Sequence, residues 1–448
     1  MTRRPDPRGV AAAALAGALL AGEWEPSAMA RRAQRSLADR RVWLRRVADL
    51  AVARYPERPA DRPRELARFV ARTDPFTRAF AERDRPPPRP RHWPPAPTEM
   101  GPTPWRVPPI PDLGRLATWL GVTDRHLAWF ADRRSYERTA RDARLVHHHR
   151  HWVRKSDGSL RLLEAPKREL KDLQRQVLHL VLDRIPAHPA VHGFRPGRSA
   201  LTAAAPHAGR AVVIRLDLEA FFTSVTAGRV YGTFRLAGYP EPVAHALTGL
   251  CTTATPRAVL ARAPRPAHDG QVDRRRRLLA HLAAPHLAQG APTSPALANL
   301  AAHRLDRRLA GLARRLGATY TRYADDLVLS GDRGLAHRTD GVVDLVGRIV
   351  VEEGFRLHDG KTRVRTAAQR QVVTGLVVNA HPNVTRPEYD RLRAVLHDAA
   401  RSGPAAANRD GHPDLRAHLL GRISWVAATN PGRGAKLARA FAAVDWGP

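Results

Sequence analysis

The chain has 448 residues, with 75 Lys and Arg against 42 Asp and Glu, and its formal net charge is +33. This length is typical of two or three domains, and a charge this large points to a polyanionic partner, either nucleic acid or an acidic membrane surface. The single cysteine, Cys251, excludes a disulfide framework, a Cys-based zinc finger and an iron–sulfur cluster. It also fits a reducing, cytoplasmic setting.

The first 85 residues predict a helical N-terminal extension, because Ala, Leu and Arg dominate and apolar residues recur near a 3.6-residue period. The longest apolar run, residues 10–21, is well short of the ~20 residues that a membrane-spanning helix needs. Its Ala-rich composition favours an N-terminal helix over a signal peptide. Residues 86–111 contain 12 prolines, which predicts a stiff, extended linker.

Beyond the linker, helical and strand patterns alternate. Thr123 is a plausible N-cap within a helical stretch at 113–131, and Asp157-Gly158 predicts a hairpin turn. An amphipathic helix is expected at 168–185. The remaining expectations are a buried strand at 211–218, a Pro/Arg-rich surface insertion at 254–280, two strands meeting at a tight turn in 319–330, helices at 341–353 and 388–400, and a strand at 371–379.

Acidic residues occur where buried strands end. Asp217 ends the run AVVIRLD, and Asp325-Asp326 is followed by an apolar run that includes Val328 and Leu329. Carboxylates in such places are costly unless a cation neutralises them, and Mg²⁺ prefers carboxylate oxygen. Buried strands ending in acids converge on one edge of a sheet. Asp217, Asp325 and Asp326 could therefore hold two metal ions for in-line phosphoryl transfer.

Several motifs in order then resemble the palm of a reverse transcriptase, most closely that of bacterial retron enzymes. The motifs are RLLEAPK (161–167), HGFRPGRSA (192–200), LDLEAFFTSV (216–225), QGAPTSPALAN (289–299), TRYADDLVLSG (321–331), GFRLHDGKT (354–362) and VVTGLVVN (372–379). The resemblance implies an α/β right-hand polymerase, with fingers and palm over residues 112–384 and a helical thumb over 385–448. The extension at 1–85 and the linker at 86–111 would precede them.

The resemblance also implies roles at the catalytic centre. Asp217 would bind both of two Mg²⁺ ions, for which Mn²⁺ could substitute. Asp325 would bind the catalytic ion, with Asp326 beside it, and Lys361 would protonate the leaving pyrophosphate.

Other positions match substrate-binding motifs. Lys155 and Arg161 would grip the triphosphate, and Gln289 and Gly290 would contact the incoming nucleotide. Phe222 matches the aromatic that rejects a ribose 2′-hydroxyl, whereas Phe221 is expected in the core. The predicted nucleic-acid-binding residues are Arg195, Arg198, Thr374 and Gly375.

Two segments depart from the family pattern. The usual Leu-Pro-Gln-Gly is Leu287-Ala288-Gln289-Gly290 here, which keeps the glutamine and loses the proline. The Asn-Ala-x-x-His segment of many retron enzymes becomes Ala203-Ala204-Ala205-Pro206-His207, which keeps the histidine and loses the asparagine.

Three further features have plain interpretations. The histidines at 147, 148, 149 and 151 are expected to contact phosphate or face solvent. Arg274–Arg277 is a solvated charge run that could add to a nucleic-acid groove. Trp425 is expected in the core of the C-terminal helices.

The implied reaction is DNA synthesis from dNTPs on a structured non-coding RNA that serves as template and primer, with an RNA–DNA hybrid as product. The resemblance allows a role in anti-phage defence and an effector protein as a further partner, and it implies no membrane. Three alternatives stay open: another bacterial reverse transcriptase class (intron, diversity-generating or phage-defence), a catalytically silent RNA-binding protein, and a template-directed RNA polymerase.

Overall fold

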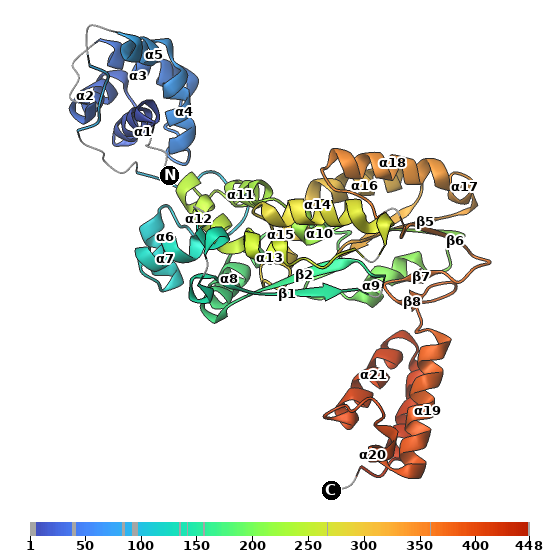
Figure 1. Cartoon of the computed structure of the whole chain (residues 1–448). Coiled ribbons are helices and arrows are strands. Elements are labelled where there is room, and N and C mark those ends of the chain that lie inside the picture. Colours follow the sequence, from blue (N-terminus) through green and yellow to red (C-terminus); the bar gives the residue numbers. More distant parts are fainter. Residues whose placement is uncertain are drawn as a thin grey trace. The chain divides into compact units, whose positions relative to one another are not determined.

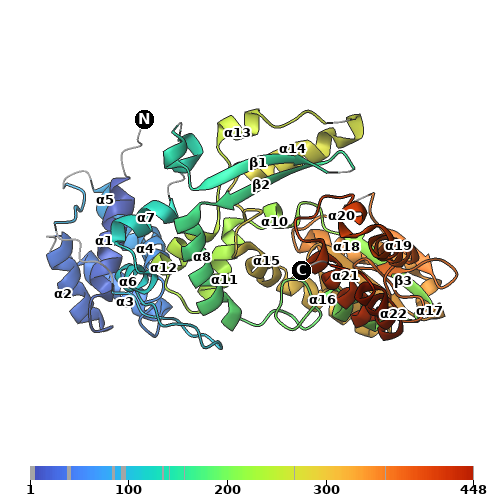
Figure 2. The same cartoon turned by 90° about the horizontal axis from the view of Figure 1, so that it is seen from below.

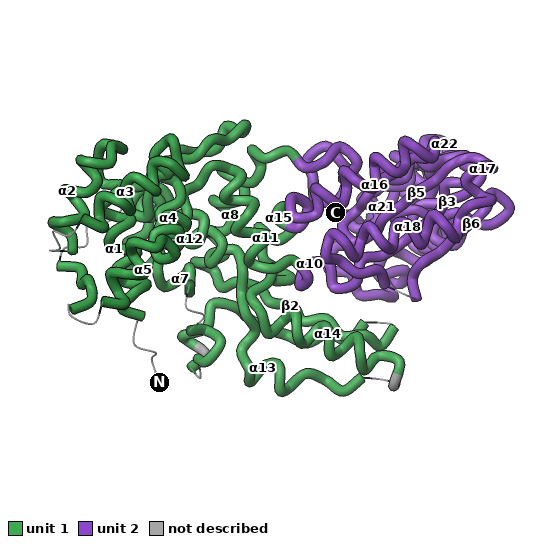
Figure 3. The backbone as a smooth tube through the Cα atoms, turned by 90° about the horizontal axis from the view of Figure 1, so that it is seen from above, with its two compact units in different colours: residues 1–186, 225–297 green, residues 187–224, 298–448 purple. Residues whose placement is uncertain are grey.

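The structure is a computed structural model that describes residues 6–37, 42–82, 86–91, 97–133, 136–140, 142–155, 157–266, 268–358 and 360–446. Parts of the predicted extension and linker, including Trp93, lie outside these ranges. The chain divides into two compact units (Figure 3): unit 1 is residues 1–186 and 225–297, and unit 2 is residues 187–224 and 298–448. No helix in the described ranges is long and apolar enough to cross a membrane.

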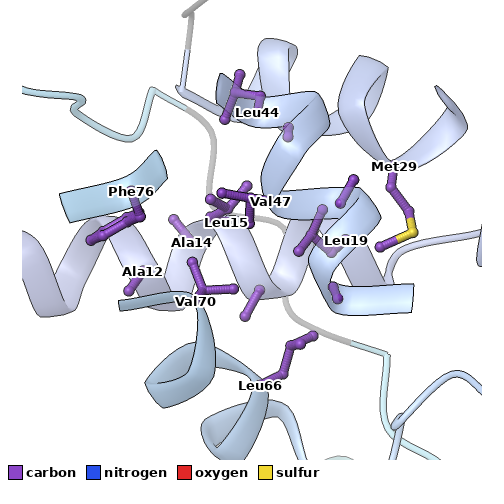
Figure 4. Packing of buried hydrophobic residues seen from close by; sticks show 14 of the residues in the cluster. Ala12, Ala14, Leu15, Leu19, Met29, Leu44, Val47, Leu66, Val70 and Phe76 are labelled. Carbon is purple, nitrogen blue, oxygen red and sulfur yellow. The ribbon is translucent and has the colours of Figure 1, made fainter. Parts of the chain in front are cut away.

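Unit 1 begins with five helices around one apolar core. They are α1 (Pro7–Leu20), α2 (Pro26–Leu37), α3 (Trp43–Arg54), α4 (Pro63–Arg72) and α5 (Asp74–Ala81), coloured blue in Figure 1. The Asp6 carboxylate caps α1 by accepting hydrogen bonds from the backbone N–H groups of Arg8 and Gly9. Alanines along α1 let α2 and α4 pack closely on it, and Leu15, Leu19 and Val70 fill the space between helices (Figure 4).

The Pro-rich stretch has neither helix nor strand over residues 97–111. Its backbone is tied down within unit 1, because the N–H of Gly101 donates to the carbonyl of Gly238 at 2.7 Å. Ile110 is buried. This part of the stretch is therefore in contact with the chain at Gly238.

The rest of unit 1 surrounds a two-stranded hairpin. Its strands are β1 (His148–Arg154) and β2 (Leu160–Pro166), as the Asp157-Gly158 turn predicts. The surrounding elements are α6 (Leu113–Leu120), α7 (Asp124–Ala131), η1 (Tyr136–Thr139), η2 (Ala143–Leu145), α8 (Arg168–Leu180), η3 (Leu182–Arg184), α11 (Ala227–Leu236), α12 (Glu241–Cys251), α13 (Arg257–Ala261), η5 (Asp269–Gln271) and α14 (Val272–Ala283). Thr123 caps α7 by accepting from the N–H of His126, as predicted.

The Pro/Arg-rich insertion packs on this hairpin. It contains α13 and α14, which lie beside β1 and β2 (Figure 2). The Trp152 indole donates to the carbonyl of Val259 at 3.3 Å, and Arg154 donates to the carbonyl of Arg265 at 3.0 Å. The insertion is therefore an ordered layer on the hairpin.

The prediction for the histidine tract is wrong for two of its members. His147 and His148 are buried, whereas His149 and His151 are exposed. His148 lies 3.5 Å from the Glu137 carboxylate, which also pairs with Arg150 at 2.9 Å. Burial acts to raise the pKa of Glu137, but the neighbouring His148 and Arg150 side chains outweigh it and lower this pKa to about 2. Successive side chains of a β-strand point to opposite faces, which explains why His148 is buried while His149 and His151 are exposed. His147 lies before the strand, and its ring nitrogen lies 3.1 Å from the carbonyl oxygen of Trp129.

Unit 2 is built on a four-stranded antiparallel sheet with the order β4-β5-β3-β6. The strands are β3 (Val212–Asp217), β4 (Thr319–Tyr323), β5 (Asp326–Gly331) and β6 (Arg363–Thr366). Its helices are α9 (Ala200–Ala204), η4 (Ala205–His207), α10 (Phe221–Ser224), α16 (His303–Arg315), α17 (Arg333–Ala336) and α18 (Thr339–Glu352). Helix α15 (Ser294–Ala301) is where the chain passes from unit 1 to unit 2.

The single strand predicted at 371–379 is wrong. The segment forms a small hairpin of β7 (Val372–Val373) and β8 (Leu376–Val377). Thr374 and Gly375 make the turn, with φ angles of 47° and 86°. A left-handed pair of this kind reverses the chain, so the segment cannot continue as one strand.

The C-terminal segment is helical and shares a core with the sheet. It comprises α19 (Arg386–Ser402), α20 (Pro404–Ala407), α21 (Leu415–Thr429) and α22 (Pro431–Ala442). Leu392, Leu419 and Leu437 from these helices belong to the same apolar cluster as Val213 and Val328. Trp425, which was expected in the core, is partly buried and packs against the outside of this cluster.

Candidate active site

Two paired strands bring the three predicted aspartates to one end of the sheet. Asp217 at the end of β3 is the direct cross-strand partner of Asp326 at the start of β5. Asp325 lies in the turn between β4 and β5, and its carbonyl accepts a hydrogen bond of 2.9 Å from the N–H of Leu218. Ala324 makes this tight turn possible with a φ of 55°. The predicted meeting of two strands at a turn is confirmed.

Two cations engage two of these carboxylates. Lys361 Nζ lies 3.2 and 3.0 Å from the two oxygens of Asp217, so the predicted catalytic lysine lies at the predicted site. The Arg215 guanidinium donates to both oxygens of Asp326 at 3.0 Å. Sequence reasoning missed Arg215. The signal available was a charged residue inside a buried strand, on the same face as Asp217 two positions later.

The surroundings of Asp325 and Asp326 favour the protonated, neutral form of both carboxyl groups. Burial, and after it the nearby Asp217 carboxylate, raises the pKa of Asp325. Burial also raises the pKa of Asp326, although Arg215 opposes this shift. A divalent cation would relieve both effects, and carboxylate oxygens are the donors that Mg²⁺ prefers. Within the described part of the chain, no three His, Cys, Asp or Glu side chains are already arranged to hold a metal ion. The donor chemistry fits Mg²⁺, and the Lys361 and Arg215 pairs occupy two of the three carboxylates.

A fully buried ion pair is hydrogen-bonded to the turn that carries Asp325. The Arg322 guanidinium donates to both oxygens of Asp306 at 2.7 Å, and neither side chain is exposed to solvent. Burial disfavours the charge on Arg322, but Asp306 outweighs it and raises the pKa of the guanidinium. Arg322 also donates to the carbonyl of Ala324 at 3.0 Å. The turn that holds Asp325 is thereby fixed to α16.

The same arginine reaches a second segment through Asn299. Arg322 donates to the Asn299 side-chain oxygen at 3.0 Å, and the Asn299 amide donates to the carbonyl of Gly193 at 3.0 Å. Gly193 admits no side chain, because a Cβ there would stand 2.6 Å from the backbone nitrogen of Ala324. This network ties HGFRPGRSA to the turn.

Aromatic rings border the aspartates. Phe221 is buried against Phe355, which confirms its expected place in the core. Phe222 is half-buried, and its ring centroid lies 6.0 Å from that of Phe194. Phe194 also lies 6.5 Å from Tyr323.

The predicted triphosphate and nucleotide residues lie in unit 1. Arg161 lies on β2, and Lys155 directly follows β1, where its N–H donates to the carbonyl of Ser159 at 2.8 Å. The carbonyl of Gln289 accepts a 2.9 Å hydrogen bond from the N–H of Glu164, so the Gln-Gly segment is joined to β2. Gly290 is exposed with a φ of 131°, and a Cβ there would meet Ala165 at 3.3 Å. The segment therefore keeps a defined place without the family's proline.

The predicted nucleic-acid-binding residues lie in two motifs of unit 2. The Thr374 hydroxyl donates to the carbonyl of Ala200 at 2.8 Å and so joins the two motifs. Arg198 is exposed. Arg195 is partly buried and donates to the carbonyls of His188 and Val191, so it also secures its own loop.

Comparison with known proteins identifies the family. The profile described as "Reverse transcriptase (RNA-dependent DNA polymerase)" matches residues 153–385, just over half of the chain. The chain belongs to the reverse transcriptase family. The reverse transcriptase match includes all three aspartates and Lys361, and membership carries a right-hand, polymerase-like α/β fold.

The similar proteins are reverse transcriptases of retrons. The retron Mx65 enzyme of Myxococcus xanthus is 47% identical over 289 residues, covering 64% of this chain and 62% of that protein. The retron Mx162 enzyme of the same organism is 40% identical over 344 residues, covering 73% and 65%. The retron Ec86 enzyme of Escherichia coli is 34% identical over 239 residues, covering 53% and 65%. The predicted resemblance to bacterial retron reverse transcriptases is confirmed. The chain spans less than two thirds of the length of each of these relatives.

Proposed function

We propose that the chain is an RNA-directed DNA polymerase of the retron type. The observation that carries this proposal is the meeting of Asp217, Asp325 and Asp326 at one end of two paired strands, with Lys361 on Asp217. Similarity to three retron reverse transcriptases supports it. The reaction joins the primer hydroxyl to the α-phosphate of a dNTP, and pyrophosphate leaves.

The aspartates are the proposed holders of two Mg²⁺ ions. Asp217 would contact both ions and Asp325 the catalytic one, with Asp326 beside them. The chemistry supplied by bound magnesium is activation of the primer hydroxyl and stabilisation of the leaving oxygen. Lys361 would exchange its contact with Asp217 for the pyrophosphate and donate a proton there.

The remaining predicted residues would select and hold the substrates. The half-buried ring of Phe222 would exclude a ribose 2′-hydroxyl and so favour dNTPs. Lys155 and Arg161 would bind the triphosphate through charge-assisted hydrogen bonds. Gln289 and Gly290 would contact the nucleotide base pair.

The proposed partner is a structured non-coding RNA that supplies both template and primer, the latter a 3′ end or an internal 2′-hydroxyl. The net charge of +33 supports a nucleic-acid partner. Fingers and palm would occupy residues 112–384, the thumb 385–448, and the helical extension 1–85. The single cysteine is in keeping with a reducing cytoplasm. A role in anti-phage defence, with an effector protein, belongs to the same proposal.

The test begins with full-length protein purified from its native host with its nucleic acid retained. The extracted nucleic acid is treated separately with RNase and DNase. A short single-stranded DNA joined to an RNA is the expected result. The same preparation, given a primed RNA template, Mg²⁺ and dNTPs, should incorporate dNTPs and discriminate against rNTPs.

Other outcomes would change the assignment. RNA alone, together with dNTP incorporation, would move the chain to another reverse transcriptase class. Equal use of rNTPs would favour a template-directed RNA polymerase. RNA binding without any incorporation in Mg²⁺ or Mn²⁺ would identify a catalytically silent RNA-binding protein and overturn the proposal.

A further inference from the structure

Phe194 is an exposed aromatic side chain that directly follows two buried residues of its motif. His192 and Gly193 before it are buried, whereas Phe194 is 48% exposed. A single exposed hydrophobic residue is ordinary on a protein surface and means little alone. Two further observations give this one significance.

The first observation is the backbone conformation of Phe194. Its φ is 59°, in the left-handed region that bulky L-residues rarely adopt. Strain of this kind persists only where the surroundings enforce it, and it gathers at functional sites. The enforcing contacts are on the same segment: the N–H of His192 donates to the carbonyl of Arg322 at 2.8 Å, and the Asn299 amide holds the carbonyl of Gly193. Phe194 is therefore presented in a fixed position next to the turn that carries Asp325.

The second observation is the pair of rings beside it. The Phe194 ring lies 6.0 Å from Phe222 and 6.5 Å from Tyr323. Under the proposed function, Phe222 faces the sugar of the incoming nucleotide. Tyr323 precedes the turn whose Asp325 the primer hydroxyl must reach. The group that must lie next to both is the terminal nucleotide of the primer.

We propose that Phe194 binds the primer-terminal base pair and holds the primer end in place for reaction. This inference rests on the proposed function and adds a primer-binding residue to it. Aromatic side chains bind bases and sugars through their faces without regard to sequence, which suits a position that every primer end must pass. The strained backbone keeps the ring turned out of the core and available to this ligand.

The test compares Phe194→Asn with Phe194→Tyr in the full-length protein. Asparagine tolerates the left-handed conformation, so this variant should fold with an unchanged or higher Tm. Removal of the ring should raise both the Kd for an RNA–DNA hybrid and the KM for primed template by about tenfold. The KM for dNTP should stay within about twofold, and Phe194→Tyr should restore hybrid binding. Leu236→Asn removes an apolar side chain in unit 1 that is 68% exposed, against 48% for Phe194, and is the control, with no expected effect.

Several results would overturn the inference. A lower Tm with unchanged hybrid affinity would make Phe194 a packing residue. A raised KM for dNTP with unchanged hybrid affinity would place the ring at the nucleotide instead. The Kd is measured by fluorescence anisotropy and needs no catalysis. A wild type that binds hybrid but incorporates nothing would therefore contradict the proposed function, while the comparison of Kd values would still decide the role of Phe194.

Discussion

The core of helices α1–α5 and the core beneath the β4–β5 turn contain different kinds of side chain. In the described residues from 6 to 82, the buried polar residues are Ser36 and Thr73, and the rest of the core is aliphatic or aromatic. Beneath the turn, Arg322, Asp306 and Asn299 are buried and joined to one another, and His207 is buried nearby.

This difference separates two uses of a core. Apolar packing stabilises a fold without direction, so it fixes shape and little else. A buried ion pair contributes little net stability, because removing its charges from water offsets their attraction. Its hydrogen bonds are directional, however, and those of Arg322 end on the carbonyl of Ala324 in the turn that holds Asp325. We infer that the polar core orients the catalytic turn and that the helical core only stabilises its own module.

The largest effect is expected from breaking the buried ion pair. Arg322→Met leaves the Asp306 carboxylate buried without a cation and should lower the free energy of unfolding by about 3–5 kcal/mol. The double variant Arg322→Met/Asp306→Leu should recover much of that loss, because no charge remains buried. Its kcat should stay low, because the carbonyl of Ala324 still lacks its donor. Chemical denaturation and primer extension measure the two quantities. Full kcat in the double variant would show that the network has no orienting role.

A large stability effect without a catalytic effect is expected in the helical core. Leu15 is fully buried in α1, and Leu15→Ala should lower the free energy of unfolding of its module by about 3 kcal/mol. At temperatures where the module stays folded, kcat on a primed template should equal that of the wild type. Leu50→Ala in α3 is the matched control, since Leu50 is 42% exposed. A fall in kcat for folded Leu15→Ala would mean that this module also positions the catalytic residues.

A smaller, pH-dependent effect is expected at His207. Its two ring nitrogens lie 2.7 Å from the hydroxyl oxygens of Ser330 and Thr321, and burial, with Arg210 and His192 nearby, lowers its pKa to about 3. A histidine with a lowered folded-state pKa contributes stability that is complete above its unfolded pKa of about 6.5 and is lost as the pH falls toward 3.

The test compares the wild type with His207→Gln, which cannot take up a proton. Between about pH 7 and about pH 5 the wild type should lose more Tm than the variant does, by the equivalent of about 2 kcal/mol. Parallel curves for the two proteins would mean that His207 does not carry this dependence.

The sequence was most informative where chemistry and local pattern coincide. The Asp157-Gly158 hairpin, the Thr123 cap and the turn at Asp325 all follow from short-range rules, and the structure confirms them. Motif order was sufficient to predict the family that the comparison then showed. His207 is the histidine kept in the segment that otherwise departs from the family pattern. Its ring links β4 and β5 by hydrogen bonds to the hydroxyl groups of Thr321 and Ser330.

The sequence could not predict hydrogen bonds and ion pairs between side chains that are far apart in the chain. Arg215 and Asp326 are far apart in the chain, and so are Arg322, Asn299 and Gly193, and only the sheet register and helix packing bring them together. The prediction that the histidine tract is exposed was wrong for a related reason. His148 is buried beside Glu137, a residue outside the strand that also pairs with Arg150. The turn in 371–379 was not predicted, because threonine rarely adopts the left-handed conformation that Thr374 has here and so is not a typical turn residue.

The most direct test of the central claim is primer extension by Asp325→Asn beside Asp344→Asn. Both variants remove one carboxylate from unit 2 and keep the side-chain size, but Asp344 is exposed on α18. We predict that Asp325→Asn folds, binds RNA–DNA hybrid as the wild type does and incorporates no dNTP in Mg²⁺, whereas Asp344→Asn keeps full activity. Full incorporation by Asp325→Asn would contradict the assignment of the catalytic carboxylates and the proposed polymerase mechanism with it.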